Sequence, residues 1–227
     1  MLFLLILLIF FCIIISIQKN GDQMNICYIF GSLDVKKLNF YPDENDFIIA
    51  ADKGILNAEK FGLKPNYIVG DFDSLEYVPT GKNVIKHPVM KDDTDLLLAI
   101  KTGFDNGFKT FRIFGCIGGD RLDHTIASIQ ACSYIKQLGG NAIFYDEKTS
   151  LMLLKNEYIS LPENSNGIVS VFSYSESSCV SIKGLLYELE NHTITQNHPL
   201  GVSNEFVGNK AKITVHNGTV LIIIKEN

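Results

Sequence analysis

Hydrophobic, β-rich runs alternate with helix-length segments along the first part of the chain, and this alternation stops near Ser150. Strands that are apolar throughout, with helices between them, are typical of a parallel sheet covered on both faces. The expected helices are residues 95–104 and 125–138, and the apolar face of the second would contain Ile126, Ile129, Ile135 and Leu138. The expected strands are residues 26–30, 47–51, 67–69, 84–87, 110–114 and 141–145.

After Ser150 the chain becomes rich in Ser, Asn, Gly and β-branched residues. This composition favours short antiparallel strands, and the pair Asn217-Gly218 indicates a hairpin, because both residues tolerate positive φ. We therefore expect an α/β N-terminal domain with a mostly parallel sheet at 23–149, and an antiparallel β-sandwich or barrel at 150–227. The expected strands of the second domain are 167–174, 179–183, 185–189, 212–215 and 219–224.

Residues 1–22 form an apolar leader that we place outside the fold. Residues 1–18 are just long enough to anchor the protein in a membrane. A signal peptide fits less well, because no Lys or Arg precedes the apolar run and no small-x-small cleavage site follows it. Translation could instead start at Met24. We favour a late start, or an extension without a role in function, and a cytoplasmic protein, as the dispersed cysteines without a CxxC pair also suggest.

The charge of the chain excludes one class of function. The formal net charge is -5 and no stripe of Lys or Arg is present, so we expect no nucleic-acid partner. Neither the phosphate-binding GxxxxGK[ST] motif nor a kinase-like GxGxxG motif occurs in the sequence. Any phosphate ligand is therefore expected to be small and to bind in another way.

Three acidic clusters follow expected strands, where open α/β folds collect ligands. In GDFDS, Asp71 and Asp73 alternate, so their side chains project to the same side of an extended segment. Two close carboxylates repel each other, and hard oxygen ligands favour Mg²⁺. A loop with ordinary Asp caps and turns is the alternative. In DDTD, Asp92 and Asp93 are interpreted as helix capping, whereas Asp95 lies beside the apolar face of the helix, with Thr94 as a cap.

The third cluster, GGDRLDH, precedes the long expected helix. Gly118 and Gly119 would turn backbone N–H groups toward an anion, and Arg121 offers a fork for phosphate oxygens. Asp123 could bind metal, accept a proton from a hydroxyl, or cap the helix, while the role of His124 stays open. Taken together, the clusters predict positioning and electrostatic stabilisation of a phosphoryl-type transition state.

These motifs resemble those of the thiamine pyrophosphokinase family from about Asn25 to Ile224. The resemblance includes AADKG, GDFDS, KDDTD and GGDRLDH, and in the second half KGLLYEL and GVSNEF. It implies transfer of a pyrophosphoryl group from ATP to the hydroxyl of thiamine, giving thiamine diphosphate and AMP with Mg²⁺ as cofactor. It also implies a homodimer with the active site at the subunit interface.

The resemblance also implies roles for single residues. The 23–149 domain would bind ATP and Mg²⁺, and the 150–227 domain would bind thiamine. Asp71, Asp73 and Asp95 match metal-binding and catalytic carboxylates, and Arg121 and Asp123 match a phosphate-clamping and catalytic pair that also contacts ATP. Further ATP contacts fall on Asp52, Lys91 and Thr94, and thiamine contacts fall on Tyr187, Ser203 and Asn204.

Two other functions fit part of the sequence. A Mg²⁺-dependent phosphohydrolase of a small nucleotide or sugar phosphate could use the same carboxylates, but it would not need the YEL and SNEF motifs. The second alternative is a membrane-tethered module that binds thiamine without catalysing a reaction. Incubation with ATP, Mg²⁺ and thiamine separates the three.

Overall fold

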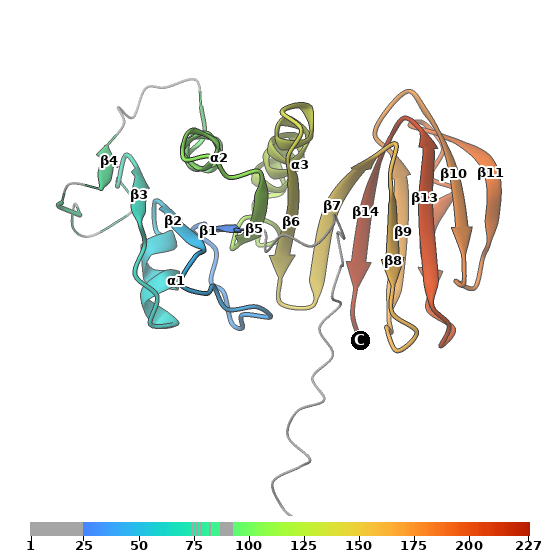
Figure 1. Ribbon diagram of the computed structural model, residues 1–227, viewed down its shortest axis with the longest axis horizontal. Coiled ribbons are helices and arrows are strands. Elements are labelled where there is room, and N and C mark those ends of the chain that lie inside the picture. The colour runs from blue at the N-terminus through green and yellow to red at the C-terminus, as the bar shows by residue number, and fades with distance from the viewer. Residues whose placement is uncertain (1–24, 74, 76, 78, 82, 87–92) are drawn as a thin grey trace, which may run out of the picture. The chain divides into compact units, whose positions relative to one another are not determined.

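The computed structural model describes residues 25–227 apart from residues 74, 76, 78, 82 and 87–92 (Figure 1). The expectations for the leader, for a start at Met24, and for Lys91 and Asp92 lie outside the described residues. The described chain divides into two compact units between Leu153 and Leu154. Across the described ranges, no helix combines the length and the apolar character needed to span a membrane.

The first unit is built on a mostly parallel sheet with the strand order β7-β6-β5-β1-β2-β3-β4. Strands β1 to β6 run parallel, and only β7 pairs antiparallel, with β6. The fold class is therefore the one expected. The strands are β1 (Cys27–Phe30), β2 (Phe47–Ala51), β3 (Tyr67–Gly70), β4 (Val84–Lys86), β5 (Thr110–Phe114), β6 (Asn141–Asp146) and β7 (Thr149–Lys155).

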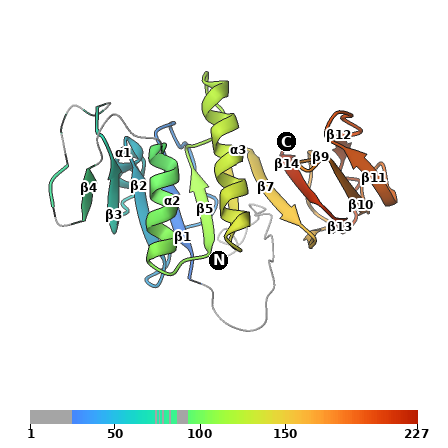
Figure 2. The same ribbon diagram turned by 90° about the horizontal axis from the view of Figure 1, so that it is seen from above.

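Within the described residues, three helices cover the sheet: α1 (Gly54–Lys60), α2 (Asp95–Asp105) and α3 (Leu122–Gln137). Figures 1 and 2 show α2 and α3 on one face and α1 on the other. The central strand β1 is buried at all four of its residues, as a strand covered on both faces must be. The core of this unit therefore lies in two layers, above and below β1.

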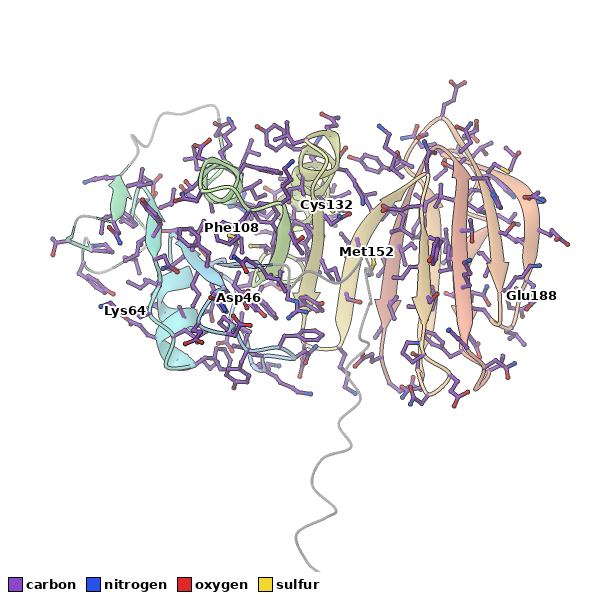
Figure 3. All side chains as sticks on the ribbon, viewed as in Figure 1. Asp46, Lys64, Phe108, Cys132, Met152 and Glu188 are labelled. Atoms are coloured by element: carbon purple, nitrogen blue, oxygen red, sulfur yellow. The ribbon has the colours of Figure 1, made fainter. Side chains whose placement is uncertain are left out.

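The apolar face expected for α3 was partly wrong. Ile126 and Leu138 are about half exposed, at 51% and 47%. The buried residues of α3 are Ser128, Ala131, Cys132 and Ile135, of which Cys132 is labelled in Figure 3. Three of these four side chains are small, so the helix can pack closely against the sheet. The larger side chain of Ile126 lies on the exposed side of the helix.

The second unit contains two antiparallel sheets, with the orders β12-β9-β14 and β11-β10-β13-β8. Alternate residues of its strands are buried, for example Val169 and Val171 on β9, which is the pattern of strands with one face in a core. The strands are β8 (Tyr158–Leu161), β9 (Ile168–Ser173), β10 (Ser177–Lys183), β11 (Leu189–Thr195), β12 (Gly201–Glu205), β13 (Ala211–Asn217) and β14 (Thr219–Lys225).

Two local expectations for this unit were wrong. Residues 185–188 form a loop with one isolated bridge, Leu185 to Phe206, and only Leu189 belongs to a strand, as the first residue of β11. The pair Asn217-Gly218 does not close a hairpin, because β13 pairs with β8 and β10, whereas β14 pairs with β9 in the other sheet. Gly218 alone adopts positive φ, at 94°, so this turn carries the chain from one sheet to the other.

The domain boundary expected between 149 and 150 differs from the division at Leu153. Strand β7 begins at Thr149 and pairs with β6 through Phe144–Leu151 and Tyr145–Ser150. The first residues of β7 therefore belong to the α/β unit, as an antiparallel strand added to a parallel sheet. The end of helical periodicity in the sequence marks the last helix rather than the last strand of that unit.

Candidate active site

The candidate site lies where the parallel strands of the first unit end. The chain leaves β1 for one side of the sheet and later returns to β5 on the other side, so β1 and β5 flank the topological switch point. Open α/β sheets bind ligands near this point, outside the carboxyl ends of the strands. Asp52 follows β2 directly, and Asp71 follows β3.

Three carboxylates come together at this edge. Asp52, Asp71 and Asp73 each offer an oxygen, and these oxygens all lie within 4.8 Å of one another. The register of β2 and β3 explains the meeting, because Ala51 pairs with Val69 and the N–H of Asp52 donates to the carbonyl of Val69 at 2.9 Å. The sequence had placed Asp71 and Asp73 in a metal site and Asp52 among the ATP contacts.

The carboxylates disturb one another electrostatically. The negative charge of Asp71 is the largest cause that raises the pKa of the Asp73 carboxyl above its ordinary value, and smaller contributions come from desolvation, Asp52 and Asp95. Asp73 is exposed, Asp71 is half-buried and Asp52 is buried, so the group opens to solvent on one side. Because a cation between the oxygens would relieve the repulsion, the donor set fits a hard divalent metal.

Two residues at the cluster have an uncommon backbone conformation. Asp52 and Phe72 adopt positive φ, at 49° and 62°, which is uncommon for residues other than glycine. Phe72, which lies between Asp71 and Asp73 in the sequence, is buried, with 3% of its surface exposed. A Cβ at Gly70 would lie 3.2 Å from the Cα of Asp52, so a glycine lets β2 and β3 approach closely here.

Asp95 and Thr94 lie at the start of α2. The hydroxyl of Thr94 accepts a hydrogen bond from the N–H of Leu97 at 3.2 Å, so the expected cap is confirmed. Asp95 is half-buried and contributes to the raised pKa of Asp73, although it is not one of the three carboxylates whose oxygens lie within 4.8 Å of one another. The expected capping by Asp93 was wrong, since its side chain pairs with Lys101 at 2.5 Å.

Arg121 and Asp123 pair with each other at the start of α3. The Nε of Arg121 donates to Oδ1 of Asp123 at 3.3 Å and its Nη2 donates to Oδ2 at 2.5 Å. This hydrogen bonding is the largest cause that lowers the pKa of Asp123 below its ordinary value. Both side chains are mostly exposed. The pair therefore presents a guanidinium fork and an ionised carboxylate to solvent.

Two finer expectations for GGDRLDH were wrong. Asp123 lies inside the first turn of α3, whose N-cap is Arg121 without a side-chain cap, so Asp123 is not the cap. The N–H of Gly118 donates to the hydroxyl of Thr125 at 3.2 Å rather than facing an open anion site. His124 is exposed.

The residues expected to contact thiamine gather in the second unit. Tyr187 lies in the loop between β10 and β11 with 65% of its surface exposed, while Ser203 and Asn204 lie on β12. The Oδ1 of Asn204 accepts from the N–H of Tyr187 at 2.9 Å, and its Nδ2 donates to the carbonyl of Tyr187 at 2.7 Å. Asn204 is buried and holds the backbone of Tyr187, which leaves the tyrosine ring free to meet a ligand.

Sequence reasoning missed Ser32 and Asn57 at the edge of the first unit. The hydroxyl of Ser32 donates to Oδ2 of Asp52 at 3.3 Å, and buried Asn57 bonds to the backbone of the loop that carries Ser32. A serine two residues after a buried strand was a usable signal, because that position reaches the ligand edge of the sheet. For Asn57, a polar residue facing inward on a short helix, the sequence offered no clear indication.

The fold and the site define a two-unit protein whose α/β unit presents a carboxylate cluster suited to a metal-bound phosphate ligand. The family model "Thiamin pyrophosphokinase, catalytic domain" matches residues 38–144, and "Thiamin pyrophosphokinase, vitamin B1 binding domain" matches residues 156–220. The chain therefore belongs to the thiamine pyrophosphokinase family, as its motifs had indicated.

Individual proteins agree with this assignment. The chain is 26% identical over 197 residues to thiamine pyrophosphokinase of Bacillus subtilis, covering 83% of this chain and 92% of the relative. It is 25% identical over 193 residues to thiamin pyrophosphokinase 1 of Caenorhabditis elegans, covering 76% and 75%.

Two solved structures share the fold. The crystal structure of the Bacillus subtilis enzyme has a TM-score of 0.78 at 23% identity, covering 89% of this chain and all of that one. Thiamin pyrophosphokinase from Candida albicans has a TM-score of 0.71 at 16% identity, covering 90% of each chain.

Proposed function

We propose that the chain transfers the pyrophosphoryl group of ATP to the hydroxyl of thiamine, releasing thiamine diphosphate and AMP. The observation that carries the proposal is the cluster of Asp52, Asp71 and Asp73 at the ligand edge of the sheet, inside the segment that matches the family's catalytic domain. The phosphohydrolase alternative gains no support from the comparisons, since the second half of the chain matches a vitamin B1 binding domain.

Mg²⁺ is the metal we assign to this cluster. Three carboxylates with mutually repelling charges fit a small cation that prefers oxygen ligands. When bound, Mg²⁺ would supply charge neutralisation at the ATP phosphates. Asp52, Asp71 and Asp73 would hold it, and Asp95 at the start of α2 would approach the same ion or its bound water.

Arg121 and Asp123 would act beside the transferred group. The guanidinium of Arg121 offers paired N–H donors that match phosphate oxygens, and it could exchange Asp123 for phosphate when ATP binds. Because the pKa of Asp123 is lowered, its carboxylate is a weak base. We therefore assign Asp123 to orienting the thiamine hydroxyl by a hydrogen bond, while Thr94 and Lys91 remain proposed ATP contacts.

Thiamine binding is assigned to the second unit. The exposed ring of Tyr187 suits the cationic thiazolium of thiamine, since aromatic faces attract cations. Ser203 adopts positive φ, at 58°, on β12, beside the residue that holds Tyr187. We assign Ser203 to a polar contact with the ligand and Asn204 to holding the tyrosine, with direct contact between Asn204 and thiamine as a further expectation.

The proposal includes a homodimer whose active site lies at the subunit interface, as the family resemblance implies. Light scattering of the purified protein tests it, since a monomeric mass at assay concentration would contradict it. A cytoplasmic location stays a prediction, which mapping of the mature N-terminus in cells would test.

The reaction itself is tested by incubating the protein with ATP and Mg²⁺, with and without thiamine, and separating the nucleotides. We expect AMP only when thiamine is present. Phosphate release that does not depend on thiamine would support hydrolysis instead, and thiamine binding without any product would indicate a binding module.

A further inference from the structure

The loop that follows β1 is held in place by the rest of the first unit. The N–H of Gly31 donates to the carbonyl of Phe114 at 2.8 Å, and the N–H of Leu33 donates to the carbonyl of Gly115 at 3.0 Å. There is no room for a side chain at Gly31, where a Cβ would lie 2.3 Å from the sulfur of Cys116. The loop therefore continues the pairing of β1 with β5 beyond the ends of both strands.

Asn57 fixes the same loop from the other side. Its Nδ2 donates to the carbonyls of Gly31 and Leu33 at 2.7 and 2.8 Å, and its Oδ1 accepts from the N–H of Val35 at 3.0 Å. Only 5% of Asn57 is exposed, so these bonds form largely out of water, where losing a partner is costly. One side chain of α1 thus holds the backbone of the loop at three residues.

Ser32 lies between two of the residues that Asn57 holds, and its hydroxyl donates to Oδ2 of Asp52 at 3.3 Å. Asp52 in turn lies two residues before α1, the helix that carries Asn57. The start of α1 is pressed against the end of β1, since a Cβ at Gly54 would lie 1.8 Å from the carbonyl oxygen of Phe30. Asn57 therefore holds the loop that carries Ser32, and Ser32 contacts Asp52. Asp52 in turn lies just before the helix that carries Asn57.

We propose that Ser32 and Asn57 are positioning residues for the Asp52 carboxylate, so that the geometry of the metal site depends on two side chains that bind no metal themselves. The inference rests on the proposed function, because it takes the carboxylate cluster to be a metal site. Hydrogen bonds from a second layer of residues fix the orientation of ligating carboxylates, and their loss lowers metal affinity about 10- to 100-fold.

The test is binding of Mn²⁺ alone to the full-length protein, followed by electron paramagnetic resonance, for the wild type and for S32A, S32T, N57A and N57S. We expect S32A to weaken Mn²⁺ binding about 10-fold and S32T to restore it, because threonine keeps the hydroxyl. N57A and N57S should weaken binding while part of each protein remains folded. Serine and asparagine controls in the second unit, S177A and N197A, should bind as the wild type does.

The melting temperature of each variant separates positioning from a purely structural role. Ser32 is exposed, so S32A should melt as the wild type does, and weaker Mn²⁺ binding cannot then be ascribed to unfolding. If S32A and the folded fraction of N57S bind Mn²⁺ with wild-type affinity, the inference is overturned and the metal site stands. If the wild type binds no Mn²⁺, or D71N binds it equally well, the metal site itself fails and the inference fails with it.

Discussion

The guanidinium of Arg121 and the carboxylate of Asp123 form two hydrogen bonds across a single intervening residue, at 3.3 and 2.5 Å. The pair lies at the first turn of α3, where the helix has no side-chain cap. In the proposed function, Asp123 holds the guanidinium of Arg121 in place until a phosphate of ATP displaces it. The arrangement keeps the guanidinium oriented without burying it, since both side chains remain mostly exposed.

Replacing Arg121 with Gln should raise the pKa of Asp123 toward the ordinary range for aspartate. The hydrogen bond from Arg121 is the largest cause of the lowered pKa, and glutamine carries no charge. A lowered folded-state pKa stabilises the fold above the ordinary pKa of aspartate, and this contribution is lost as the pH falls through the lowered value. Carboxyl ¹³C NMR titration measures the shift. K60Q is the control, and an unchanged Asp123 titration in R121Q would contradict the pairing.

Asp52→Asn should impair catalysis as severely as Asp71→Asn, by about 100-fold or more in kcat, because each removes charge from a preorganised site. Both substitutions nearly preserve the shape of the side chain, so circular dichroism should be unchanged. Asp105→Asn, at the exposed end of α2, is the matched control and should retain full activity. If D52N has the wild-type dependence on Mg²⁺ concentration, Asp52 does not belong to the metal site.

The contrast between Asp52 and its neighbours shows what sequence reasoning can reach. The sequence predicted that Asp71 and Asp73 lie together, and they do, although the segment turns at Phe72 instead of running extended. Asp52 joins them only because β2 and β3 are adjacent and in register, with Ala51 opposite Val69. Pairing between strands distant in sequence is set by packing of the whole sheet, so a single motif cannot reveal it.

The same limit explains the local errors in the fold. The strands of the parallel sheet were predicted within one residue at each end, because each is a short apolar run bounded by polar residues. The inward face of α3 was harder to identify, since Ser128, Ala131 and Cys132 are less hydrophobic than the exposed Ile126. Small side chains allow the helix to pack closely against the sheet there. A prediction from periodicity considers only hydrophobicity, so it does not identify them.

Phe72 should anchor the cluster through its buried ring. Phe72→Ala should lower the free energy of unfolding by about 3 kcal/mol, as expected for removing a buried aromatic side chain, and Phe72→Leu should lower it by less. Because residue 72 adopts positive φ, Phe72→Gly should be no less stable than Phe72→Ala, the reverse of the usual order. Urea unfolding measures all three. A glycine variant clearly less stable than the alanine variant would contradict the strain at this position.

Tyr187→Ala should raise the KM for thiamine about 10-fold, since stacking and cation–π contact are worth roughly 1–2 kcal/mol. The KM for ATP should change little, and Tyr187→Phe should resemble the wild type. Tyr158→Ala provides a matched control, because Tyr158 is similarly exposed, at 61%, but contacts Lys212 on the outer face of its sheet. Initial rates at varied thiamine concentration measure the KM for thiamine, and an unchanged value in Y187A would remove Tyr187 from the thiamine site.

The central claim is that two phosphates move together from ATP to thiamine, and the fate of labelled phosphates tests it most directly. The protein is incubated with Mg²⁺, thiamine and ATP labelled at the α- or at the γ-phosphorus, and the products are separated. We predict that the γ label appears in thiamine diphosphate and the α label in AMP, in equal amounts. Appearance of the γ label as inorganic phosphate, at the same rate with and without thiamine, would contradict the account.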